Sequence, residues 1–121
     1  MVLKEVVNLL DAEVLTGTSD PELELNSAFS SYMMSHMLAY SNDKSILITA
    51  LYNPQVLRTA DLMGISCVIF IGRSEPDPAL IKLAESLGVT VVQSPYSMYV
   101  TCGILFSNGL QGAFQNEQGR K

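Results

Sequence analysis

The sequence lacks the short motifs that identify several large classes of enzyme. It has no Gly-x-x-x-x-Gly-Lys-Ser/Thr loop, which excludes nucleotide hydrolysis or phosphoryl transfer through a P-loop. The Gly-x-Gly-x-x-Gly fingerprint of dinucleotide binding is absent too, because Gly72 stands alone in its loop. No Gly-x-Ser-x-Gly turn surrounds Ser94 or Ser97. We therefore predict no catalytic residues and no dinucleotide cofactor.

Positive charge is scarce as well. The chain has seven Lys and Arg against twelve Asp and Glu, which gives a formal net charge of −5. Nucleic-acid binding depends on neutralising many phosphates, so this balance argues against a nucleic-acid surface.

Cysteines and long apolar runs are also few. Cys67 and Cys102 lie far apart and form no Cys-x-x-Cys pair, so we expect buried thiols in a reducing compartment. No apolar stretch is long enough to cross a bilayer, and Lys4, Glu5 and Asn8 interrupt the first apolar residues, unlike a signal peptide. We expect a cytoplasmic protein without membrane partners.

What the sequence does contain is enough apolar material for one core. At 121 residues and 48% hydrophobic, it predicts a single compact domain over residues 1–110, followed by a polar tail over 111–121. Apolar positions three and four residues apart predict a helix over 3–10. Short strand-like or edge elements are expected near 12–15 and 23–25. Ser30 and Ser31 are expected to cap a Met-rich helix through Tyr40.

The second half alternates strand-like and helix-like segments. Buried strands are expected at 46–50, 67–71 and 89–92, and helices beginning at Pro54, at Pro78 and at about Ser97. This order predicts an α/β fold with three layers, in which helices flank a mainly parallel sheet.

A small polar residue followed by proline marks three of the expected strand-to-helix junctions: Asn53-Pro54, Asp77-Pro78 and Ser94-Pro95. Such pairs suit a helix cap and the first helical position. If the strands are parallel, these helix N-termini gather at one sheet edge, where open α/β sheets bind ligands. Arg73 would add a bidentate donor there. The candidate ligand-binding residues are Asn53, Gly72, Arg73, Ser94 and Ser97, although ordinary capping explains the junctions equally well.

His36 is the only histidine, and it lies among Met33, Met34 and Met37. Imidazole and thioether ligands suit soft metals, but methionines at helical spacing more often fill a core. We therefore expect no metal site and no general base at this position.

Several stretches together resemble the DRTGG domain family: LKEVVNLLDAEVLTG at the start, SSYMMSHMLAY before ILIT, and VIFIGRSEPDPALIKLAESLGVTVVQSPYS with the apolar helix after it. The chain is similar to a freestanding member. Related domains occur in pyrophosphatases that carry CBS domains, in some phosphotransacetylases, and as the N-terminal domain of HPr kinase. The family has a Gly-Asp-Arg type loop where this chain has Leu51-Tyr52-Asn53, so no arginine contact from that loop is carried over. It also often has Thr where Ser94 and Ser97 stand.

The resemblance implies a regulatory or ligand-sensing module without catalysis. Our first hypothesis is a domain that binds a small anionic, phosphate-bearing ligand at the sheet edge, with adenine nucleotides as candidates. The alternative is an interaction module that docks a larger redox or metabolic enzyme, because freestanding members resemble accessory proteins of enzymes such as hydrogenases. The apolar helices expected at 31–40 and 97–108 also predict a homodimer. An enzyme is the third and weakest hypothesis.

Overall fold

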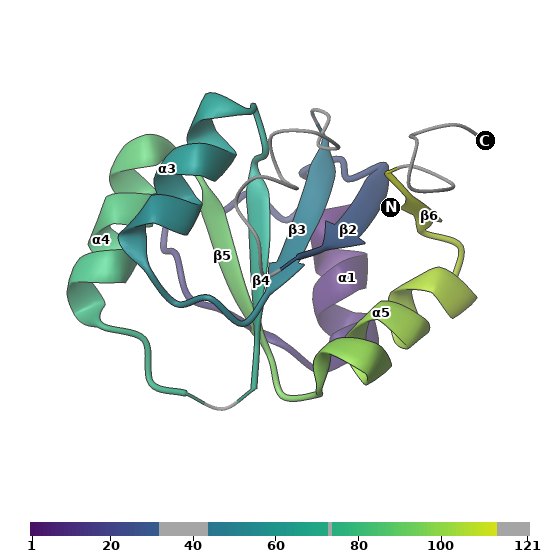
Figure 1. Ribbon diagram of the computed structural model, residues 1–121. Coiled ribbons are helices and arrows are strands. Elements are labelled where there is room, and N and C mark those ends of the chain that lie inside the picture. The colour runs from purple at the N-terminus through teal and green to yellow at the C-terminus, as the bar shows by residue number, and fades with distance from the viewer. Residues whose placement is uncertain (32–43, 73, 114–121) are drawn as a thin grey trace.

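The computed structural model describes residues 1–31, 44–72 and 74–113, and it has an α/β architecture (Figure 1). The helices are α1 (Leu3–Leu10), α3 (Pro54–Leu62), α4 (Pro78–Leu87) and α5 (Met98–Ser107), and the strands are β1 (Glu13–Val14), β2 (Ser27–Ser30), β3 (Ser45–Thr49), β4 (Cys67–Ile71), β5 (Thr90–Ser94) and β6 (Gln111–Gly112).

One six-stranded sheet, in the order β1-β5-β4-β3-β2-β6, runs through the described residues. β1 is antiparallel to β5, and every other neighbouring pair is parallel. The mainly parallel sheet that the alternating strands and helices predict is therefore confirmed. The central strands β3, β4 and β5 carry the apolar runs, as expected of strands that helices cover on both faces.

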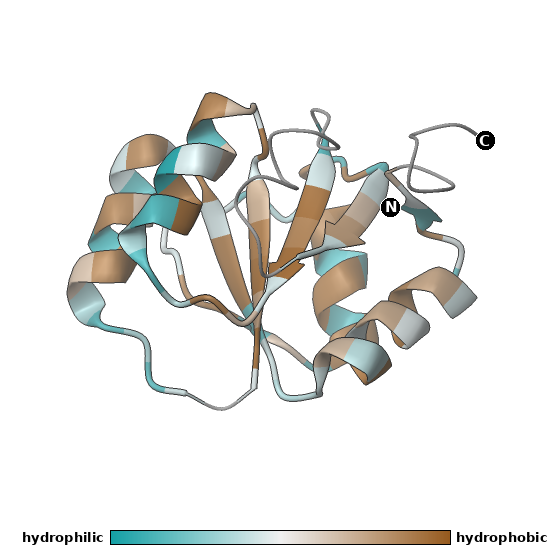
Figure 2. Cartoon of the chain, in the orientation of Figure 1, coloured by the Kyte–Doolittle hydropathy of each residue, from teal (hydrophilic) through white to brown (hydrophobic). Residues whose placement is uncertain are grey.

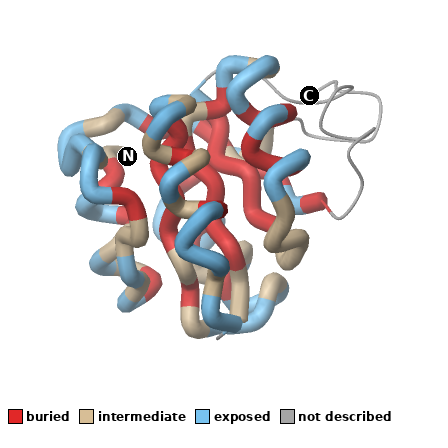
Figure 3. The backbone as a smooth tube through the Cα atoms, turned by 90° about the vertical axis from the view of Figure 1, so that its left-hand side faces the viewer, coloured by how far each residue is buried: buried red, intermediate tan, exposed pale blue. Residues whose placement is uncertain are grey.

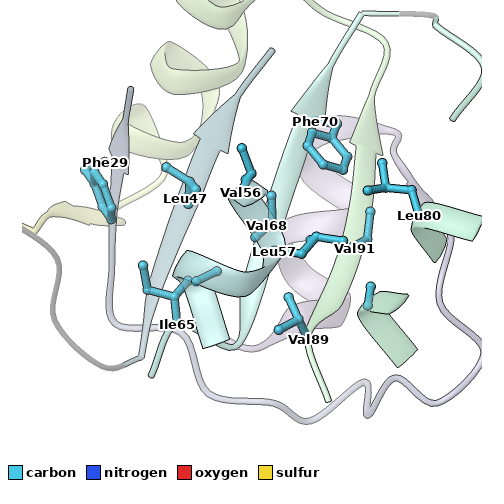
Figure 4. Close-up of a cluster of buried hydrophobic side chains, with 12 residues drawn as sticks. Phe29, Leu47, Val56, Leu57, Ile65, Val68, Phe70, Leu80, Val89 and Val91 are labelled. Atoms are coloured by element: carbon cyan, nitrogen blue, oxygen red, sulfur yellow. The ribbon is translucent and has the colours of Figure 1, made fainter. Parts of the chain in front are cut away.

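Successive side chains of a strand point to opposite faces, and β4 shows how this builds two cores. Val68 and Phe70 pack on one face beneath α3 and α4 (Figure 4). Cys67 and Ile69 pack on the other face with α1 and α5. The buried residues lie along the strands and the inner sides of the helices, and brown apolar colour follows the same strands (Figures 2 and 3). The three-layer arrangement is confirmed.

Two of the three cap-proline junctions have the predicted geometry. The Asn53 side chain accepts a hydrogen bond from the Val56 N–H, and Pro54 begins α3. The Asp77 carboxylate accepts from the Ala79 N–H, and Pro78 begins α4. In each helix the proline occupies a position whose N–H has no helical partner, so no hydrogen bond is lost.

The third junction differs from the prediction. β5 continues to Ser94, and α5 begins only at Met98, where the Ser97 side chain accepts from the Val100 N–H. Pro95 therefore lies in the connecting turn and not in the first helical position. The reason is local, because the Ser94 hydroxyl instead accepts the Tyr96 N–H and stays buried beneath the turn.

The prediction that Ser30 caps a helix is wrong, because Ser30 is the last residue of β2. Half of the residues of β2 are serines, so its sequence lacks the apolar run that predicts a buried strand. The Ser27 hydroxyl is satisfied by the hydroxyl of Ser45 at 2.9 Å, in the facing register position of β3. The Met-rich segment through Tyr40 lies outside the described residues.

The domain also extends slightly past its predicted end. Gln111 and Gly112, expected in the polar tail, form β6 and pair with β2, and the Ala113 N–H donates to the Ala28 carbonyl. Residues 114–121 lie outside the described part. Among the helices that the structure describes, none is long and apolar enough to span a membrane.

Candidate functional site

The carboxyl ends of β3, β4 and β5 lie side by side at one edge of the sheet. Thr49 pairs with Phe70, and Ile71 pairs with Ser94. The chain leaves this edge toward α3, α4 and α5 in turn (Figure 1). The edge therefore has the location at which open α/β sheets bind ligands.

Tyr52 connects the three strand ends. Its ring stacks on Phe70 at a centroid distance of 4.4 Å and an interplanar angle of 19°. Its hydroxyl donates to the Ile71 carbonyl at 2.8 Å and accepts from the Gln93 side-chain amide at 3.0 Å. The same amide of Gln93 also donates to the Ser74 carbonyl, so the loop after β4 is held by the network as well.

A pocket of about 330 Å³ opens between the first turns of α3 and α4 at this edge. It is lined by Tyr52, Pro54, Arg58, Asp77, Ala79, Leu80 and Leu83. Arg58 is exposed, and within the described part of the chain no carboxylate pairs with it. The pocket therefore combines an unpaired guanidinium, a phenol ring and the N-terminus of α3, whose dipole favours an anion. Asp77 carries the one carboxylate of the lining, and it already accepts the Ala79 N–H.

None of the predicted site residues that the structure describes is among the residues lining this pocket. Asn53 lies beside it as the cap of α3. The Gly72 N–H, proposed as a ligand contact, donates instead to the Ser94 carbonyl at 3.1 Å. Gly72 has φ +86°, a left-handed conformation that glycine adopts without strain. Arg73 lies outside the described residues.

The two serines of the predicted site lie away from the pocket. Ser94 is wholly buried, and its hydroxyl is 2.9 Å from that of Thr101 on α5. Ser97 is exposed at the N-terminus of α5, which packs on the α1 face of the sheet. Because α3 and α4 cover the opposite face, Ser97 does not share a cavity with Asn53.

The sequence analysis named none of the residues that line the pocket as ligand contacts, and Arg58 and Tyr52 are the two whose side chains matter most for an anionic ligand. Arg58 follows Pro54 by four residues, which places it one turn along the same face of α3. This spacing in the sequence could have predicted a positive charge near the N-terminus of α3, which Asn53 caps. Nothing in the sequence indicated that the Tyr52 hydroxyl would reach two neighbouring strands.

A second, larger cavity lies on the opposite face of the sheet. It measures about 720 Å³ and runs between α5 and the strands β2 and β6. Cys102, half-buried in its wall, has its thiol pKa raised by burial, while a hydrogen bond with Ser30 lowers that pKa in part. No residue that lines this cavity carries a charge. We call it the α5 groove.

The described residues contain no cluster of three or more His, Cys, Asp or Glu side chains that could hold a metal ion. His36 and the methionines around it lie outside the described part, so the expectation that they form no metal site stays a prediction from the sequence.

Comparison with known proteins agrees with this fold. The sequence model of the DRTGG domain matches residues 5–107. No curated protein matches the chain. Among solved structures, the CBS and DRTGG domains of the regulatory region of Clostridium perfringens pyrophosphatase, in complex with the activator diadenosine tetraphosphate, are similar with a TM-score of 0.72.

The sequence identity to that structure is 16%, over 86% of this chain and 45% of the other, so this chain spans less than half of its neighbour's length. The likeness therefore concerns the fold. The family match extends over most of the sequence and agrees with the resemblance that its motifs carry. This chain belongs to the DRTGG domain family.

Proposed function

We propose that this protein is a non-catalytic, cytoplasmic regulatory domain that senses a small phosphate-bearing ligand at the carboxyl edge of its sheet. The pocket between α3 and α4 supports this proposal most directly. It places the Arg58 guanidinium and the N-terminus of α3 around one opening, and both favour negative charge. Arg73, at the end of β4 in the sequence, is proposed as a second cation.

Adenine nucleotides are the first ligands to test. The activator bound to the similar pyrophosphatase region is diadenosine tetraphosphate, which combines adenine rings with phosphates. In this chain the Tyr52 ring lines the pocket beside Arg58, so an aromatic surface and a cation are available together. We propose that a phosphate contacts Arg58 and that the base lies near Tyr52.

Thermal unfolding with AMP, ATP and diadenosine tetraphosphate tests the proposal. A ligand at 100 times its dissociation constant stabilises the folded state by roughly 2.7 kcal/mol. Arg58→Gln should weaken binding by about tenfold or more, because hydrogen bonds to charged groups contribute about 1.5–3 kcal/mol. Lys82→Gln is the matched control, since it removes one positive charge from α4 outside the pocket lining.

If none of the three nucleotides, nor inorganic phosphate or pyrophosphate, raises the melting temperature of the wild type, the ligand-sensing proposal is wrong. If a nucleotide binds but Arg58→Gln and Lys82→Gln bind equally well, the ligand lies elsewhere. Arg73→Ala then becomes the next variant, because Arg73 is the other cation expected at this edge.

A second candidate function is an accessory module that docks a redox or metabolic enzyme. The observation that favours it is the apolar outer side of α5, where Tyr99 is 89% exposed and Phe106 is 70% exposed. Exposed apolar patches of this kind commonly mark interaction surfaces. A charge placed on α5 would abolish copurification with such an enzyme, whereas Arg58→Gln would leave it intact.

A further inference from the structure

Among the described residues, three of the five exposed large hydrophobic side chains lie on α5, namely Tyr99, Val100 and Phe106. Tyr99, Gly103 and Phe106 follow one another at steps of four and three residues, so they lie on one face of the helix. Val100 beside them is 41% exposed. Thr101 and Leu105 on the reverse side are buried against the sheet. We call the four exposed residues the α5 face.

The α5 face also lies in the longest uncharged stretch of an acidic chain. No charged residue occurs in the sequence between Glu85 and Glu117, although the chain carries a net charge of −5. Two copies of an acidic protein repel each other over most of their surfaces, and this repulsion is weakest where charge is absent. The cores of protein interfaces are likewise depleted in charge and enriched in aromatic residues.

The arrangement of this face is close to self-complementary. Gly103 lies between the two aromatic rings, with Tyr99 four residues before it and Phe106 three residues after it. In an antiparallel pair of helices that crosses beside Gly103, the ring of Tyr99 on one copy therefore meets the partner's Phe106, and the reverse contact follows by symmetry. A glycine at the crossing lets the two backbones approach closely.

We propose that the α5 face binds a second copy of this chain, with the two α5 helices antiparallel and crossing at Gly103. The sequence predicted a homodimer from two apolar helices, and α5 is the one that lies within the described residues. The four residues of the α5 face form one wall of the uncharged α5 groove, and its opposite wall, which includes Ala28, Phe29 and Ile48, provides further apolar surface for the partner's rings. This proposal is independent of the ligand pocket, which lies on the other face of the sheet.

The apolar area is adequate for a reversible dimer. An aromatic side chain buries about 150–250 Å². With the observed exposures of Tyr99 and Phe106, the four rings of two copies would bury roughly 500–800 Å² in total. Val100, Gly103 and the rim of the α5 groove add to this, toward the roughly 1,000 Å² that a specific interface needs. We therefore expect a dimer that dissociates on dilution.

Light scattering of the purified protein over a range of concentrations tests the proposal. The wild type should approach twice the 13.2 kDa of one chain. Gly103→Glu should give a monomer, since it places two carboxylates at the crossing. A Cβ at Gly103 would meet no atom within 4 Å, so the substitution should not disturb the fold of the monomer. Leu62→Glu is the matched control, because Leu62 is 77% exposed on α3, away from α5, and this variant should remain dimeric.

A charge-reversal pair tests the crossing point itself. Gly103→Glu and Gly103→Lys should each be monomeric alone, and an equimolar mixture should form a heterodimer, because the two-fold axis brings the substituted positions together. A wild type that stays at 13.2 kDa at the highest concentrations would overturn the proposal. A dimer that Gly103→Glu leaves as intact as Leu62→Glu does would place the interface elsewhere and would equally overturn it.

Discussion

Replacing Tyr52 by phenylalanine should destabilise the carboxyl edge of the sheet. The substitution keeps the stack on Phe70 and removes only the hydroxyl. That hydroxyl makes two hydrogen bonds, one to the Ile71 carbonyl at 2.8 Å and one from the Gln93 amide at 3.0 Å. Tyr52 follows β3, and its hydroxyl is hydrogen-bonded to one residue of β4 and one residue of β5. Loss of the hydroxyl therefore removes contacts between three neighbouring segments at once.

The expected cost follows from these contacts. A neutral hydrogen bond contributes about 0.5–1.5 kcal/mol net, so two bonds would amount to about 1–3 kcal/mol. Tyr52 is only half-buried, and the Gln93 amide keeps its second acceptor, the Ser74 carbonyl. We therefore expect a loss of about 1–2 kcal/mol, which for a domain of this size lowers the melting temperature by roughly 3–10 °C. Tyr52→Leu also loses the aromatic stack and should cost about 0.5–1.5 kcal/mol more.

Urea denaturation at one fixed protein concentration measures the effect. Tyr96→Phe is the matched control, since Tyr96 lies outside the α5 face, is 37% exposed, and its hydroxyl makes no hydrogen bond to the described residues; this variant should stay within about 0.5 kcal/mol of the wild type. Equal free energies of unfolding for Tyr52→Phe, Tyr96→Phe and the wild type would refute the view that Tyr52 holds this edge together.

Asn53→Ala should lower the free energy of unfolding by about 1 kcal/mol with or without nucleotide, because it removes the cap on the Val56 N–H, and urea titrations in both conditions check this. Burial raises the pKa of the Cys67 thiol from 9.0 to about 12. Above pH 9 the unfolded chain therefore releases a proton that the folded chain keeps, and stability should fall by up to about 1.4 kcal/mol per pH unit; unfolding between pH 8.5 and 10.5 should show a weaker pH dependence for Cys67→Ala. Incubation with ATP or simple phosphoesters and Mg²⁺ or Mn²⁺ should match the protein-free blank, as expected without a P-loop, and turnover that persists through repurification would argue for an enzyme.

The central sheet was predictable because its signals are local. A buried parallel strand needs a continuous apolar run such as 67–71, and β4 has those bounds. The caps at Asn53 and Asp77 were equally readable, since a polar side chain before proline satisfies a nearby N–H in almost any context.

β2 was not predictable from the same signals. Its serines look like turn or cap residues until Ser27 faces Ser45 across the parallel register. The register depends on both β2 and β3, which are distant in the sequence. Neither segment reveals it when read alone. The same limit explains why Ser94, expected at a helix cap, proved to be a buried strand end that meets Thr101.

For the candidate site, the sequence determined the edge and the residue types that gather there, because parallel strands and capped helices impose that geometry wherever they occur. Only the tertiary structure decided which groups remain available to a ligand. It directed the Gly72 N–H to the Ser94 carbonyl, placed Ser97 on the opposite face of the sheet, and left Arg58 beside Tyr52 in an open pocket. The physical reason is that hydrogen bonding and burial depend on groups that are distant in the sequence. An N–H that already donates a hydrogen bond within the fold is no longer available to a ligand.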